Sequence, residues 1–61
     1  MNELKKRREA LGLTQKQVAE RIGIMQQAYS RYECSERLPN VKLGIKIAQA
    51  LETTVEELYG G

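Results

Sequence analysis

Residues 13–33, LTQKQVAERIGIMQQAYSRYE, contain the signals for two short helices joined by a tight turn. Thr14 and Gln17 form a capping box, in which Thr14 accepts a hydrogen bond from the backbone N–H of Gln17 and the Gln17 side chain reaches back. Gly23 is a typical helix terminator. A second helix is predicted over residues 26–33, after the connection Gly23-Ile24-Met25.

The side chains of these two helices divide into a buried and an exposed face. In the first helix, Val18, Ala19 and Ile22 fall on one side at helical spacing, which predicts that they face the core. In the second helix, successive residues are 100° apart, so an apolar arc and a polar arc form. The apolar arc consists of Ala28, Tyr29 and Tyr32, and the opposite arc consists of Gln26, Gln27, Ser30 and Arg31.

The residues before this segment predict one more helix, over about residues 3–11. Asn2 is its expected N-cap and Gly12 its stop. Its inward stripe consists of Leu4, Arg8 and Leu11.

The residues after the segment predict two further helices. One begins after Asn40, an N-cap residue, and runs over residues 41–51. Its polar residues Lys42, Lys46 and Gln49 form one narrow stripe, so we expect the rest of this helix to occupy the centre of the core. A second capping box, residues 54–57, starts a last helix that includes Leu58 and Tyr59. These patterns predict an all-α domain of five helices.

Length and composition restrict the possible classes of protein. The chain has 61 residues, which predicts a single domain over 1–61, and its 41% hydrophobic and 30% charged residues are typical of a globular protein. It contains one Cys and no His, so neither an internal disulfide nor a Cys/His metal site is expected, and no cofactor is predicted. Because His is the commonest general base, its absence also argues against an enzyme.

Charge is distributed unevenly along the chain. Residues 1–31 carry seven Lys/Arg and three Glu, whereas residues 32–61 carry three Lys/Arg and five Glu. A basic half indicates a face that meets a polyanion. No run longer than nine residues lacks a charge, which argues against a membrane span, and we expect a cytoplasmic location.

An ordered series of short segments extends over nearly the whole chain. It consists of Leu13-Thr14-Gln15, Val18-Ala19, Ile22-Gly23-Ile24, Tyr32-Glu33, Arg37, Pro39, Ile47-Ala48-Gln49-Ala50-Leu51 and Thr54-Val55-Glu56-Glu57-Leu58. This series resembles the lambda-repressor-like, Cro-type (XRE) helix-turn-helix family. The resemblance implies a sequence-specific DNA-binding domain, a transcription regulator of the repressor type, commonly a homodimer on a palindromic operator.

Three positions depart from the family pattern. Met25 replaces the usual Ser or Thr N-cap of the second helix of the motif, Cys34-Ser35 replaces a pair that usually ends in Gly, and Glu52 replaces a Gly that often terminates the fourth helix. The first departure puts the start of the helix over 26–33 in question.

The polar arc of that helix holds the candidate base contacts, Gln26, Gln27, Ser30 and Arg31. A Gln side chain can bond adenine at N6 and N7, and Arg31 can bond guanine or hold a phosphate. The alternative for both glutamines is a solvated helix surface, and for Arg31 a favourable charge at a helix C-terminus. The resemblance favours base contact, because base-contacting residues of relatives fall at these positions.

Phosphate contacts are expected from the residues around this helix. By resemblance, Gln15 clamps a phosphate and buttresses Gln26, and its alternative is a surface residue of the capping turn. Also by resemblance, the loop of Arg37 and Asn40 borders the second phosphate strand, and its alternative is a solvated loop. Lys16 and the outer edge of Arg8 are further candidates. The basic run of residues 5–7 either attracts phosphates or is a solvated face.

Several other residues have a structural explanation. Arg is almost never buried unless paired, so we expect an ion pair between Arg8 and Glu33, as at matching positions in the family. Tyr29 and Tyr32 are expected to pack in the core rather than stack on bases, and Cys34 is expected to be an unreactive loop thiol.

Two functions share this fold. A DNA-binding homodimer is expected to associate through Thr53, Val55, Leu58 and Tyr59. An antitoxin-like protein-interaction module, whose DNA binding is secondary, would instead expose a substantial apolar patch to a protein partner.

Overall fold

The computed structural model describes residues 2–60 as five helices, with no strand in this range. The helices are α1 (Leu4–Ala10), α2 (Gln15–Ile22), α3 (Gln26–Glu33), α4 (Val41–Ala50) and α5 (Val55–Tyr59). The all-α prediction is therefore confirmed. Met1 and Gly61, which the predicted domain 1–61 includes, lie outside the described residues.

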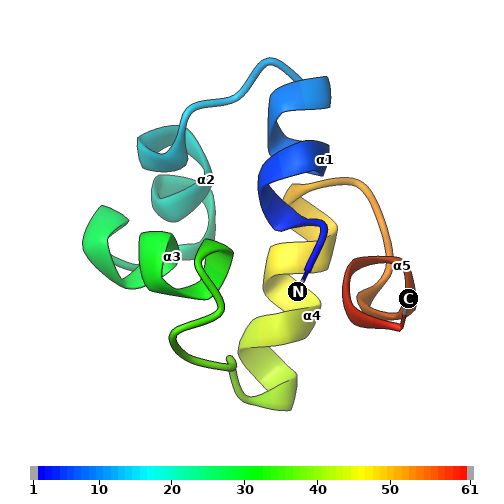
Figure 1. The fold of residues 1–61 in the computed structure, drawn as a ribbon. Coiled ribbons are helices and arrows are strands. Elements are labelled where there is room, and N and C mark those ends of the chain that lie inside the picture. Colours follow the sequence, from blue (N-terminus) through cyan, green and yellow to red (C-terminus); the bar gives the residue numbers. More distant parts are fainter. Residues whose placement is uncertain (1, 61) are drawn as a thin grey trace.

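Helix α4 is central to the arrangement. It lies between the α2–α3 pair and α5 (Figure 1), and it packs against both α2 and α5. Helices α2 and α3 also pack against each other, and α1 packs on α3. As a result, every helix buries one face, and α3 keeps its other face free.

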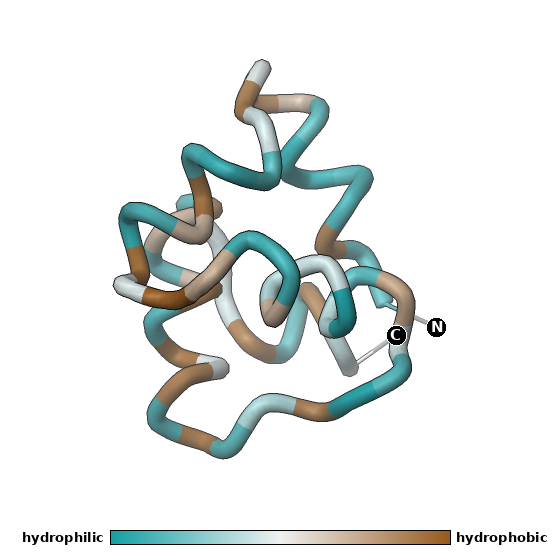
Figure 2. The backbone as a smooth tube through the Cα atoms, turned by 90° about the vertical axis from the view of Figure 1, so that its left-hand side faces the viewer, coloured by the Kyte–Doolittle hydropathy of each residue, from teal (hydrophilic) through white to brown (hydrophobic). Residues whose placement is uncertain are grey.

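The core is aliphatic around one tyrosine. The buried hydrophobic side chains are Leu4, Val18, Ala19, Ile22, Tyr29, Ile47, Ala48, Leu51 and Leu58. Short hydrophobic stretches alternate with hydrophilic ones along the whole backbone (Figure 2), as amphipathic helices require. Because Tyr29 is fully buried, the prediction that it packs rather than stacks on bases agrees with the structure.

Side-chain caps fix the start of three helices. In α2, Thr14 and Gln17 make both bonds of the predicted capping box. Asn40 accepts a hydrogen bond from the backbone N–H of Leu43 at 2.8 Å, as predicted for the N-cap of α4. In α5, Thr54 accepts from the N–H of Glu57 at 3.2 Å, while its hydroxyl contacts the Glu57 carboxylate at 3.4 Å. The cap of α5 therefore differs from the reciprocal box that was predicted.

The start of α1 also differs from the prediction. Glu3, not Asn2, is the N-cap residue, and its side chain makes no cap bond. Asn2 nevertheless accepts from the N–H of Leu4 at 3.0 Å, and its amide donates to the carbonyl of Tyr32 at 2.8 Å. Asn2 thus joins the beginning of α1 to the end of α3, a contact that helix periodicity does not predict.

The prediction that α4 is wet only along Lys42, Lys46 and Gln49 is wrong. Val41 is 82% exposed and Ile45 is 45% exposed, although both lie outside that stripe. Val41 and Ile45 line an open pocket together with residues of α5, so α5 leaves them exposed. An apolar strip of α4 therefore faces solvent.

Arg7 has a role that the sequence did not indicate. Its Nε donates to the carbonyl of Leu51 at 2.9 Å and its Nη2 donates to the carbonyl of Glu52 at 2.8 Å. Carbonyl groups at a helix C-terminus lack partners within the helix, and basic side chains satisfy them well. Arg7 therefore belongs to the packing of α1 against the end of α4.

Two of the three departures from the family pattern coincide with unusual backbone. Ser35 has φ 61° and Glu52 has φ 57°, the left-handed region in which Gly is favoured. Both residues follow a helix, α3 and α4 respectively. The chain thus keeps the left-handed turn at these positions without the glycine that would favour it.

A search of the described residues finds no helix whose length and hydropathy would allow it to cross a membrane.

Candidate nucleic-acid interface

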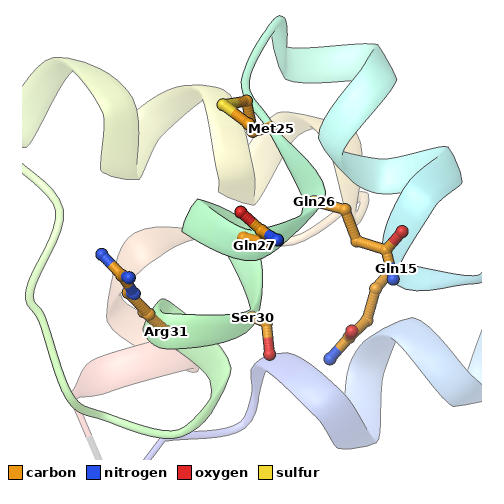
Figure 3. Close-up of a pocket in the computed structure, with 6 residues that line it drawn as sticks. All are labelled: Gln15, Met25, Gln26, Gln27, Ser30 and Arg31. Carbon is orange, nitrogen blue, oxygen red and sulfur yellow. The ribbon is translucent and has the colours of Figure 1, made fainter.

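The exposed face of α3 borders a shallow hollow. Its lining residues are Gln15, Met25, Gln26, Gln27, Ser30 and Arg31 (Figure 3). Gln15 comes from the first position of α2, and the others come from α3 and the residue before it. The structure therefore brings together all four predicted base-contact residues and one predicted phosphate contact. Ala28, which falls on the apolar arc, is half-buried.

The turn between α2 and α3 sets the position of this face. Gly23 ends α2 with φ 76° and ψ 32°, a left-handed cap that a residue with a side chain rarely adopts. The N–H of Ile24 donates to the carbonyl of Ala19 at 3.0 Å, and Ile24 packs against the core. The next residue, Met25, has an extended backbone and is the N-cap residue of α3. Helix α3 therefore begins at Gln26, as predicted, despite the lack of a Ser or Thr cap.

Arg8 and Glu33 form a largely buried ion pair. Arg8 Nε donates to Glu33 Oε2 at 2.6 Å, and Nη2 donates to Oε1 at 3.3 Å. Their side chains are 11% and 3% exposed. Arg8 Nη1 also donates to the carbonyl of Leu13 at 2.8 Å. The pair joins α1 to the C-terminal end of α3 and to the chain just before α2.

The charges of this pair stabilise each other. Burial raises the pKa of Glu33, but the hydrogen bonds from Arg8 and Gln15 outweigh it and leave the pKa below its ordinary value. The hydrogen bond to Glu33 raises the pKa of Arg8. Burial raises the pKa of Tyr29, and the Glu33 carboxylate raises it further. All three groups are therefore in their ordinary charge states near neutral pH.

Gln15 is linked to the same carboxylate. Its Nε2 donates to Glu33 Oε1 at 3.1 Å. Because an ionised carboxylate only accepts hydrogen bonds, this contact orients the Gln15 amide with its nitrogen toward Glu33. The amide oxygen of Gln15 does not take part in the contact. One N–H of Gln15 remains for another acceptor. The sequence did not indicate this bond, because its partners are 18 residues apart and Glu33 was expected to pair with Arg8 alone.

The other residues predicted to contact phosphates do not line the hollow beside α3. Lys16 and Arg37 are exposed. Asn40 uses its side-chain oxygen as the cap of α4, which leaves its amide N–H groups for other acceptors. Arg8 is directed to Glu33 and Leu13, so this geometry does not support the expected phosphate contact.

One residue of the predicted dimer surface does not lie on the surface. Leu58 is 2% exposed and belongs to the core, so the expectation that it contacts a second copy is wrong. Leu58 lies on the apolar side of the short helix α5, and that side faces α4 rather than solvent. Val55 is exposed, and Thr53 and Tyr59 are half-buried.

Comparison with known proteins agrees with this arrangement. A family model described as helix-turn-helix matches residues 4–58. The chain belongs to the helix-turn-helix family. The α2–α3 unit, with Gly23 at its turn and an exposed polar face on α3, is the helix-turn-helix itself.

Two curated relatives carry the same kind of domain. Over 57 residues, 93% of this chain, it is 44% identical to a protein of Vibrio cholerae named cryptic phage CTXphi transcriptional repressor RstR. Over 58 residues, 95% of this chain, it is 38% identical to an uncharacterized HTH-type transcriptional regulator, YqaE, of Bacillus subtilis. The alignments cover 51% and 50% of those relatives, so the helix-turn-helix chain spans about half their length.

Proposed function

We propose that the chain is a cytoplasmic transcription regulator, of the repressor type, that binds double-stranded DNA in a sequence-specific manner. The observation that carries this proposal is that α3 has one buried side and one exposed, polar side. Tyr29 anchors one side in the core, while polar side chains line a hollow on the other side. In helix-turn-helix proteins the second helix of the motif enters the major groove.

Direct contacts to bases come from α3. Gln26 and Gln27 open the helix, where residues reach deepest into the groove, and each can bond an adenine at N6 and N7. Ser30 and Arg31 lie one turn further on the same side and contact the neighbouring base pairs or their phosphates. These four side chains determine which operator is bound.

Contacts to phosphates position the domain without selecting a sequence. The free N–H of Gln15, together with the exposed charges of Lys16 and Arg37, supplies donors from the segments before and after α3 in the chain. The amide of Asn40 adds a donor at the start of α4. Phosphate oxygens only accept hydrogen bonds, so each of these groups is a chemically suitable partner.

One copy of so small a domain contacts few base pairs, and single modules form small interfaces with DNA. We therefore propose that the chain acts as a homodimer on a palindromic operator. Half-sites on one face of the duplex lie about 34 Å apart. The longest dimension of the domain is 25 Å. Two copies on half-sites at this spacing are therefore separated by a gap of about 9 Å or more, which side chains from both copies must bridge.

A second function is favoured by one observation. The protein-interaction alternative predicts an exposed apolar patch, and α4 does expose Val41 and Ile45. In that case α3 would remain a DNA-binding element, and a protein partner would be the main ligand.

Selection of duplexes from a random DNA pool tests the proposed function. The Gln27→Ala variant should still select a motif, but with one position relaxed, because loss of one base contact costs about 1–3 kcal/mol. Gln49→Ala is the matched control, since Gln49 is an exposed glutamine on α4 that does not line the hollow. If Gln27→Ala selects the same motif as the wild type, Gln27 does not contact a base.

A further inference from the structure

The Gln15 side chain connects the exposed hollow beside α3 to a buried charge. It lines the hollow together with Gln26 and Ser30, and its Nε2 donates to Glu33 Oε1 at 3.1 Å. The Glu33 side chain is only 3% exposed, whereas Gln26 is exposed. A carboxylate that DNA cannot reach is therefore one hydrogen bond away from the surface that we propose to read the bases.

The Glu33 carboxylate allows the Gln15 amide one orientation. Its two oxygens accept from Arg8 at 2.6 Å and 3.3 Å, and a carboxylate held ionised in this way has no hydrogen to donate. A reversed Gln15 amide would place its oxygen against a carboxylate oxygen, so that two acceptors would meet without a hydrogen between them. Because a hydrogen bond to an ionised group is about twice as strong as one between neutral groups, the reversed orientation is strongly disfavoured.

The orientation of Gln15 decides what it presents to Gln26. Gln15 from α2 and Gln26 from the start of α3 lie next to each other in the hollow (Figure 3). The amide nitrogen of Gln15 points away from Gln26, and its oxygen lies on the nearer side (Figure 3). An amide oxygen only accepts hydrogen bonds, so Gln26 can bind it only through an N–H. The oxygen of Gln26 is then directed away from Gln15.

This polarity fits adenine and does not fit guanine. When one N–H of Gln26 is bound to Gln15, the other N–H and the oxygen remain, and they pair with N7 and N6 of adenine. Guanine presents two acceptors on the same edge, N7 and O6, and has no donor there for the Gln26 oxygen. A reversed Gln15 would instead bind the oxygen of Gln26 and leave both of its N–H groups for guanine.

We propose that Glu33 is a positioning residue for base recognition, which fixes the Gln15 amide and thereby makes Gln26 select adenine over guanine. This inference rests on the proposed function, because it requires a base at Gln26. It is separate from the ion pair's role in holding the helices together, since Arg8 and Glu33 would do so with the Gln15 amide turned either way.

Binding to four duplexes that differ only at the base contacted by Gln26 tests the proposal. That base is the motif position at which Gln26→Ala loses its preference. Gln15→Met keeps the length of the side chain, removes both amide groups and leaves the Arg8–Glu33 pair in place. We expect the wild type to prefer adenine to guanine by about 5–150-fold, the value of one good bidentate contact. Gln15→Met should bring this ratio close to one and leave the preferences at other positions unchanged.

Glu33→Gln changes the partner of Gln15 instead of Gln15 itself. A neutral amide at position 33 can both donate and accept, so both orientations of Gln15 become available and the adenine preference should fall. Because this variant also loses the ion pair, Ile47→Ala is the control for stability alone. It removes a core contact in α4, away from the hollow, and should keep the wild-type ratio.

A double variant shows whether the two residues act in one chain of contacts. In a Gln15→Met background, Glu33→Gln should change the adenine-to-guanine ratio no further, because the side chain that transmits its effect is already absent. A further change in the ratio would overturn the proposal. If Glu33→Gln does not fold, the ratio measured with Gln15→Met decides the question alone.

NMR of the free protein examines the first step without DNA. The Nε2 protons of Gln15 should exchange with solvent more slowly than those of Gln49, an exposed glutamine on α4, because one of them is bonded to a buried carboxylate. Equal exchange at the two glutamines would show that Glu33 does not hold the amide, and it would overturn the proposal.

The outcomes separate this inference from the proposed function. If the wild type selects a motif, and Gln15→Met weakens binding to all four duplexes but keeps the adenine preference, Gln15 is a phosphate contact only. The inference then fails and the proposed function stands. If the wild type selects no motif, the proposed function fails and the inference fails with it, even where the Gln15 amide is held by Glu33.

Discussion

The Glu33 carboxylate connects three of the five helices. It receives hydrogen bonds from Arg8 on α1 and from Gln15 on α2, and it ends α3. The carboxylate therefore holds three helices in register beneath the face that we propose to contact DNA. Removal of one partner from a buried pair leaves the other charge uncompensated, which is strongly destabilising.

We predict that Glu33→Gln lowers the free energy of unfolding by about 3–5 kcal/mol at neutral pH. Urea denaturation measures this difference. Glu36→Gln, an exposed glutamate three residues later, is the matched control and should change stability little. A Glu33→Gln protein as stable as the wild type would show that the pair does not hold the helices together.

The same variant has a predictable pH dependence. Because the pKa of Glu33 is lowered in the folded state, its charge stabilises the protein above the ordinary value of 4.5, and that stabilisation is lost as the pH falls further. The stability gap between wild type and Glu33→Gln should therefore be constant near neutrality and narrow below about pH 4.5. A gap that widens on acidification would contradict the lowered pKa.

Residue roles could be predicted from the sequence where a local rule applied. Arg8 on an apolar stripe required a partner, and the family resemblance supplied Glu33. Gln15 was interpreted as a phosphate contact and Arg7 as part of a basic run. Their bonds to Glu33 and to the carbonyls of Leu51 and Glu52 were not predicted, because these partners are brought near only by tertiary packing.

At the scale of elements, the ends of α3 and α4 store backbone strain. Glu52 has φ 57° just beyond α4, and a non-Gly residue in this region costs about 1–2 kcal/mol. Its backbone carbonyl, rather than its side chain, receives the bond from Arg7. A glycine at this position would keep that bond and remove the strain.

We predict that Glu52→Gly raises the free energy of unfolding by about 1 kcal/mol, since relief of the left-handed strain exceeds the entropy gained by the unfolded chain. Thermal and urea unfolding measure the change. Glu57→Gly, within α5, is the contrasting variant and should destabilise, because glycine is unfavourable inside a helix. A lower stability of Glu52→Gly would show that its side chain has a stabilising contact.

Helix boundaries were well predicted where caps are explicit. Thr14, Gly23 and Asn40 mark the ends of α2 and the start of α4 in both sequence and structure. The burial of α4 was predicted less well, because hydrophobicity identifies which residues avoid water but not whether the chain has a helix to cover them. Val41 and Ile45 are apolar but exposed for this reason.

At the scale of the whole molecule, charge and shape agree with the proposed function. The basic N-terminal half contains α1, α2 and most of α3, and the acidic half contains α4 and α5. Phosphates are therefore attracted to the helix-turn-helix side of the domain.

The central claim is that the exposed face of α3 recognises a DNA sequence. Selection of bound duplexes from a random pool, followed by titration of the selected duplex at several salt concentrations, tests it most directly. We predict a palindromic motif. Lys16 and Arg37 in two copies would neutralise four phosphates, so the slope of log affinity against log salt should be about −3.6. Weak, salt-sensitive binding without any enriched motif would contradict the claim.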